Sequence, residues 1–101
     1  MVYRNQRLTL QTILQEIEQQ EIEQIESGII DLTMVLSLID QARTVIETAG
    51  SSSTKERVIL HLIQSKENIV KYNEGRADKE MDFIDMTNAV YVTIEAFLYF
   101  L

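Results

Sequence analysis

Hydrophobic residues recur along most of the chain at the spacing of an amphipathic α-helix. From Leu10 to Ile17 the apolar positions occupy one helical face, and a second series extends from Ile22 to Ile46 in steps that alternate three and four residues. Steps of this kind place side chains on one side of a helix and are typical of a heptad seam. The step from Ile17 to Ile22 is five residues, so the apolar face changes direction there.

Gly28 leaves the number of helices open. The second apolar series passes through Ser27 and Gly28 without a change of phase, which favours one long helix to about Thr48, kinked at the glycine. The alternative is a sharp turn at this point, with Ser27 as the N-cap of a separate helix. Both alternatives give the same fold class, all-α, as a small bundle of three or four antiparallel helices.

Two more helices are predicted after the break at residues 49–53. Ser53 and Glu56 form a capping box at the start of the first of them. Gly75 is placed to end this helix, and Asp78 is placed to cap the last one, which we expect to continue to the C-terminus.

The composition restricts the class of protein. The chain of 101 residues has no cysteine, which excludes disulfides, thiol catalysis and thiolate zinc sites. Its longest apolar run, residues 96–101, is much shorter than the roughly 20 residues that a membrane-spanning helix needs. The N-terminus contains no apolar run of signal-peptide length. We therefore expect a single helical domain over residues 1–101, located in the cytoplasm, with no cofactor and no membrane contact.

The net charge of −7 originates in one third of the chain. Residues 8–42 contain seven acidic residues and no basic one, whereas acidic and basic residues balance in the remainder. The acidic stretch EIEQQEIEQIE, residues 16–26, would repel nucleic acid and attract a basic protein surface. We expect no direct nucleic-acid binding, and a solvated helix face is the simplest interpretation of the stretch. As residues that bind a partner we predict Glu16, Glu18, Glu21, Glu23 and Glu26.

Two pairs of carboxylates could support metal chemistry. Glu23 and Glu26 are three residues apart, as are Asp82 and Asp85, and two such pairs on facing helices can hold Mg²⁺. The pairs resemble the helix-borne ExxE and ExxD pairs of all-helical nucleoside-triphosphate pyrophosphatases of the MazG type. The resemblance covers these four residues only, in a different order and spacing, and no set of basic residues for phosphates accompanies them. It implies, as an alternative function, a Mg-dependent all-α nucleotide pyrophosphatase-like enzyme.

Three charged residues occupy positions that the apolar pattern predicts to be buried. Lys66 lies within the apolar arc of its helix, Arg43 takes a seam position, and Asp31 lies beside apolar positions of the same face. A buried charge is costly unless it is paired. We therefore predict buried polar pairing that involves Asp31, Arg43 and Lys66, with Asp31, Asp40, Asp82 and Asp85 as the available acids. The alternative is that the long basic side chains extend to water.

The last predicted helix is apolar on two faces. One stripe contains Phe83, Met86, Val90, Ile94, Phe97 and Leu101. The second face carries Ala89, Val92, Ala96, Tyr99 and Phe100. A helix of this kind is either central in a bundle or shared with another chain. We predict that the second face is the interface of a homodimer, and the alternative is that a four-helix monomer covers both faces.

These features favour a non-enzymatic function. We predict a small regulatory adaptor or inhibitor, a protein-interaction module whose acidic helix face engages a basic partner protein. More specifically, we predict that the acidic face blocks the basic groove of a nucleic-acid-binding protein. Besides the metal-dependent enzyme, the remaining alternative is a purely structural, self-assembling helical oligomer.

Overall fold

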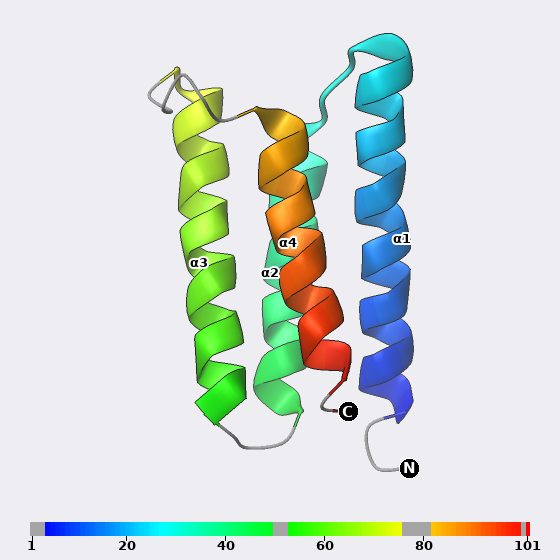
Figure 1. Cartoon of the computed structure of the whole chain (residues 1–101), viewed down its shortest axis with the longest axis vertical. Helices are drawn as coiled ribbons and strands as arrows, with labels where there is room; N and C mark the ends of the chain where they lie inside the picture. The colour runs from blue at the N-terminus through cyan, green and yellow to red at the C-terminus, as the bar shows by residue number, and fades with distance from the viewer. Residues whose placement is uncertain (1–3, 50–52, 76–81, 100) are drawn as a thin grey trace.

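The computed structural model describes residues 4–49, 53–75, 82–99 and 101, which form an all-helical bundle. Successive helices are antiparallel, and the ends marked N and C lie at the same end of the bundle (Figure 1). The all-α fold class is confirmed, and the described residues contain four helices, not three: α1 (Arg4–Ser27), α2 (Leu32–Thr48), α3 (Ser53–Asn73) and α4 (Phe83–Leu98).

The single long helix that the sequence favoured is wrong, because the chain turns at Gly28. This glycine has a φ of 73°, in the left-handed region that residues with a Cβ atom avoid. Its N–H donates to the carbonyl of Gln24 over 2.9 Å and closes the last turn of α1. The cap of α2 is Asp31, whose carboxylate accepts from the Met34 N–H over 3.0 Å. Ser27, the predicted cap, instead donates its hydroxyl to the Glu23 carbonyl over 2.7 Å.

The ends of the other helices follow similar local chemistry. Gly75, with a φ of 74°, follows α3 and donates its N–H to the Tyr72 carbonyl over 3.1 Å. The carboxylate of Asp82 caps α4 and accepts from the Asp85 N–H over 2.8 Å. Asp78, which the sequence suggested as this cap, lies outside the described residues.

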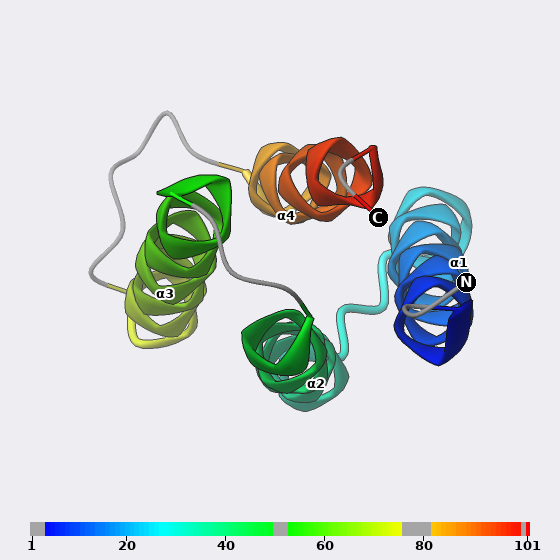
Figure 2. The ribbon, with the colours of Figure 1, turned by 90° about the horizontal axis from the view of Figure 1, so that it is seen from below.

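The four helices form a ring when the bundle is viewed along its long axis (Figure 2). Over the described residues, α1 contacts α2 and α4, and α3 contacts the same two helices. The helices α2 and α4 also approach each other across the core, whereas the backbones of α1 and α3 stay farther apart within these residues. The helix α1 is therefore flanked by α2 on one side and by α4 on the other.

The core draws apolar side chains from all four helices. The stripe predicted for the last helix is confirmed from Phe83 to Phe97, since its members are at most a few per cent exposed. Thr87 is the one buried polar residue among those described. No helix in the described part of the chain is long and apolar enough to cross a membrane. The buried apolar residues are Leu10, Ile13, Leu14, Ile17, Val35, Leu38, Ile39, Ala42, Ile46, Ala49, Val58, Leu62, Ile69, Phe83, Met86, Val90, Ile94 and Phe97.

The last turns of α1 differ from the predicted pattern. Ile22, Ile25 and Ile29, which the sequence placed on the buried seam, are 38%, 71% and 63% exposed. The last turns of α1 project beyond the ends of α2 and α4 (Figure 1). Since Ile17 is fully buried, the change of direction after it turns Ile22 and Ile25 away from the bundle, and Ile29 follows the end of the helix. The predicted seam is therefore wrong in this segment.

Candidate functional site

The five glutamates proposed for partner binding do not share one face of α1. Glu16 and Glu18 are both exposed, but at 100° per residue they diverge by about 160° around the helix. Glu26 is also exposed, whereas Glu21 and Glu23 are half-buried. The negative charge therefore surrounds α1, and no one flat partner could contact all five carboxylates.

Two of the glutamates face the groove between α1 and α4. Glu18 and Glu21 line this groove together with Asn88 and Tyr91, and the cavity has a volume of about 260 Å³. The buried hydroxyl of Thr87 lies 3.0 Å from Oε1 of Glu21 and 3.1 Å from the Ile84 carbonyl, within hydrogen-bond distance of both. A carboxylate oxygen of Glu21 thus connects α1 to α4, which gives this glutamate a structural role that the sequence did not reveal.

Tyr91 responds to the negative potential of the same groove. Its pKa is raised above the ordinary value of 10.0, first by burial and then by the carboxylates of Glu18, Glu95 and Glu21. Both causes favour the neutral phenol, because ionisation would place another negative charge in a partly desolvated acidic groove. The groove is therefore a poor site for anions and a better one for cationic groups.

The side of α1 that faces the bundle becomes polar after Ile17. Gln20, Glu21 and Gln24 follow Ile17 by three, four and seven residues, so they continue its direction, and all three are half-buried. Oε1 of Gln20 is buried and has no hydrogen-bond partner. An unpaired buried carbonyl oxygen typically costs about 1–3 kcal/mol. The upper part of α1 therefore packs on the bundle less favourably than the lower part.

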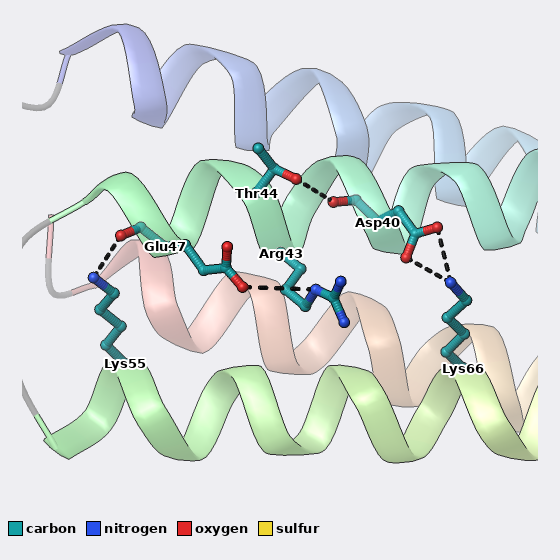
Figure 3. Close-up of polar contacts among 6 residues, drawn as sticks. All are labelled: Asp40, Arg43, Thr44, Glu47, Lys55 and Lys66. Carbon is teal, nitrogen blue, oxygen red and sulfur yellow. Dashed lines mark hydrogen bonds and ion pairs between the residues drawn. The ribbon is translucent and has the colours of Figure 1, made fainter.

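The predicted buried pairing is observed only in part (Figure 3). Lys66 of α3 donates to both carboxylate oxygens of Asp40 on α2, over 2.8 and 2.9 Å. The Lys66 and Asp40 side chains are 36% and 47% exposed, so the pair lies at the surface and does not sit in the core. An exposed pair of this kind contributes about 0–1 kcal/mol.

The other two charges of the predicted set behave differently. Arg43 lies 3.7 Å from Glu47, one turn along the same helix, and both side chains are substantially exposed. The backbone carbonyl of Glu47 also accepts from the Lys55 ammonium over 2.6 Å (Figure 3). The prediction of a buried Asp31 is wrong, because this residue precedes the first turn of α2 and serves as its exposed cap.

Two further grooves lack a convergent set of reactive groups. The groove along α2 has a volume of about 640 Å³ and is lined by hydroxyl, amide and aliphatic side chains with one carboxylate: Thr9, Thr33, Leu36, Ser37, Asp40, Gln41, Thr44 and Val45. The groove between α2 and α3, of about 320 Å³, is lined by Arg43, Ile63, Lys66, Glu67, Val70 and Lys71. In the second groove, two of the three basic side chains already pair with acids of α2.

The two carboxylate pairs do not assemble into a metal centre. Asp82 uses its carboxylate to cap α4, and the partner of that hydrogen bond is the backbone of Asp85. Among residues 4–49, 53–75, 82–99 and 101, no group of three or more His, Cys, Asp or Glu side chains is placed to hold a metal ion. The pairs Glu23–Glu26 and Asp82–Asp85 therefore lack the shared site that the resemblance to pyrophosphatases implied.

The second apolar face of α4 is exposed. Ala89, Val92, Ala96 and Tyr99 are open to solvent, with Val92 at 51% and Tyr99 at 86% exposure. Phe100, the fifth residue predicted for this interface, lies outside the described residues. The alternative that one chain covers both faces of the helix is wrong for these four residues, because none of the helices in the described ranges buries them.

The fold and these surfaces define the chain as a small antiparallel four-helix bundle with an acidic α1. A scan against protein-family models finds no matching family, and searches of the curated proteins and of the solved structures find no match.

Proposed function

We propose that the protein is a cytoplasmic, non-enzymatic protein-interaction module, an adaptor or inhibitor that engages a partner with a basic surface. One observation carries the proposal: residues 8–42, which include most of α1 and the first two thirds of α2, contain seven acids and no base. The exposed glutamates of this segment, Glu16, Glu18 and Glu26, are available for contact.

The charge distribution suggests how the contact forms. A segment with a single sign of charge attracts an oppositely charged surface over several ångströms and raises the association rate more than the final affinity. A basic groove that binds nucleic acid is a surface of this kind. By occupying such a groove, the acidic helix would exclude the nucleic acid and act as an inhibitor.

The test is affinity purification of the tagged protein from nuclease-treated native lysate at low and high salt, followed by mass spectrometry. We expect one stoichiometric partner with a basic surface at low salt and its loss at high salt. At 1 M salt the screening length is about 3 Å, against about 10 Å at 0.1 M, so a contact steered by charge weakens steeply. Retention that does not depend on salt would contradict the proposal.

A matched pair of variants separates the acidic helix from net charge. Glu16→Gln with Glu26→Gln removes two exposed carboxylates of α1, and Glu56→Gln with Glu67→Gln removes two exposed carboxylates of α3. Both variants change the net charge by the same amount. We expect only the first to lose the partner, and equal losses would show that overall charge, rather than α1, is responsible.

The exposed face of α4 supports a second candidate, self-assembly as a homodimer. Ala89, Val92, Ala96 and Tyr99 follow one another by three, four and three residues and therefore form one strip along the helix. The two alanines would let a second helix approach closely, and an isologous dimer is the commonest way to cover such a strip. This assembly does not exclude the interaction module, and without a partner it defines a purely structural, self-assembling oligomer.

Sedimentation velocity over a range of concentrations tests the dimer. We expect a reversible dimer for the wild type and a folded monomer for Ala96→Glu, since two buried carboxylates would face each other across the axis. Leu60→Glu, at an exposed position of α3, serves as the control and should leave the dimer intact. A monomeric wild type, or an unchanged Ala96→Glu dimer, would reject this interface.

A further inference from the structure

Exposed isoleucines accompany the acidic residues where α1 turns into α2. We define the α1–α2 corner as residues 22–34. It holds four of the large hydrophobic side chains that are exposed in the described residues: Ile22, Ile25, Ile29 and Met34. Its charged residues are Glu23, Glu26 and Asp31, and it contains no base. The corner therefore combines an apolar surface with negative charge of one sign.

The needs of the core do not explain this arrangement. Apart from Glu21, which accepts from Thr87, the bundle-facing positions of this segment are the half-buried amides Gln20 and Gln24, while Ile22 and Ile25 face away from the bundle. The buried Oε1 of Gln20 has no hydrogen-bond partner, so a polar side chain at this position lowers the stability of the fold. Local patterns that oppose stability are expected where a surface serves a function.

We propose that the α1–α2 corner binds a basic amphipathic helix of a partner protein. The isoleucines would cover the apolar stripe of that helix, and the carboxylates of Glu23 and Glu26 would meet its lysines and arginines. The end of α1 projects beyond α2 and α4 (Figure 1). Ile25, near this end, is 71% exposed and is therefore accessible to a partner helix. This inference rests on the proposed function and adds the apolar part of the contact.

The charge of the corner decides among possible occupants. If two copies of the chain met at their corners, carboxylates would face carboxylates, and like charges in an interface are unfavourable. The anionic surface of a membrane would repel the same residues. A helix with an apolar stripe flanked by basic residues satisfies both parts of the corner.

The test is an NMR titration of the full chain, with labelled isoleucine methyl groups, against an 18-residue helical peptide of leucine and lysine arranged with one apolar stripe. A scrambled peptide of the same composition is the control for charge. We expect saturable shifts at Ile22, Ile25 and Ile29, and weaker binding of the scrambled peptide. High salt should weaken binding of both peptides.

Two variants measure the apolar contribution. Ile25→Ser combined with Ile29→Ser changes side chains that are mostly exposed, so the fold should persist, which circular dichroism will check. We expect this variant to bind the patterned peptide about tenfold or more weakly, because two apolar contacts are lost. Leu60→Ser, an exposed apolar position on α3, should bind as the wild type does.

The outcomes separate this inference from the proposed function. Equal binding of both peptides, or unchanged affinity of the isoleucine variant, would refute the apolar contact at the α1–α2 corner. The protein would then be an acidic module that binds by charge alone. A failure of the patterned peptide to bind would also overturn the corner, whereas the lysate experiment tests the module independently. If the wild type self-associates and the isoleucine variant does not, the occupant of the corner is a second copy of the chain and the proposed partner helix is refuted. If the wild type binds phosphatidylserine vesicles, the occupant is a lipid surface and the proposal is likewise refuted.

Discussion

Replacing Gly28 with alanine tests the turn that separates α1 from α2. In the folded chain Gly28 has a φ of 73°, and a Cβ atom built on it would meet nothing within 4 Å. The substitution therefore introduces no steric clash with the rest of the protein. Its effect on stability comes from the backbone conformation alone.

The magnitude follows from two opposing terms. A residue with a Cβ atom in the left-handed region costs about 1–2 kcal/mol. Replacing glycine by alanine also restricts the unfolded chain, which stabilises the fold by about 0.4–1 kcal/mol. The expected net effect of Gly28→Ala is a destabilisation of about 1 kcal/mol, or about 4–8 °C in Tm for a domain near this size.

The continuous helix favoured by the apolar periodicity predicts the opposite sign. In the interior of a helix, alanine is more stable than glycine by about 1 kcal/mol. Urea unfolding followed by circular dichroism at 222 nm distinguishes the two cases, since they differ by about 2 kcal/mol. Gly75→Ala is the matched control, because Gly75 has a φ of 74° and equally open surroundings.

We expect both alanine variants to lose similar stability with an unchanged helical signal. A more stable Gly28→Ala protein with increased helicity would refute the turn and support one long helix through residue 28. A loss confined to Gly75→Ala would likewise show that Gly28 is not held in the left-handed region.

Three further predictions concern polar side chains. Gln20→Leu should raise the free energy of unfolding by about 1 kcal/mol in urea titrations, because it removes a buried oxygen without a partner, whereas exposed Gln19→Leu should have little effect. A double-mutant cycle of Lys66→Met and Asp40→Asn should give a coupling of at most about 1 kcal/mol that falls in high salt, and a much larger value would mean that the pair is effectively buried. The pKa of Tyr91 is higher in the folded chain than the ordinary value of 10.0. The stability that the neutral phenol contributes is therefore fully present below pH 10 and is lost as the pH rises through the folded pKa. Tyr91→Phe should therefore reduce the loss of stability above pH 10, and identical alkaline denaturation of both proteins would contradict the raised pKa.

Much of the fold could be predicted from local sequence. The stripe from Phe83 to Phe97 repeats every three or four residues, and all of its members proved to be buried. The glycines and acids that end and begin helices were also visible as residue types. The particular cap was harder to predict: Ser27 and Asp31 can both cap a helix, and only the position of the turn decides between them.

The candidate surfaces could be predicted less well. The sequence showed that α1 is acidic, but it did not show that Glu21 reaches Thr87, which is 66 residues away along the chain. The partner of Lys66 was one of several acids, and the packing of α2 against α3 selected Asp40. The apolar spacing also placed Ile22, Ile25 and Ile29 on a buried seam, but Ile22 and Ile25 lie on the side of α1 that faces away from the bundle, and Ile29 follows the end of this helix.

The sequence by itself determined that this protein is helical, where its apolar stripes lie and that its net charge is concentrated in residues 8–42. These properties depend on the order and spacing of residues within one helix, where each position fixes the direction of the next. Only the tertiary structure decided that α1 ends at Ser27, just before Gly28, that Gln20 faces the bundle and that Ile25 faces solvent. Helical periodicity gives the angle between two side chains, but the neighbouring helices decide which angle points inward.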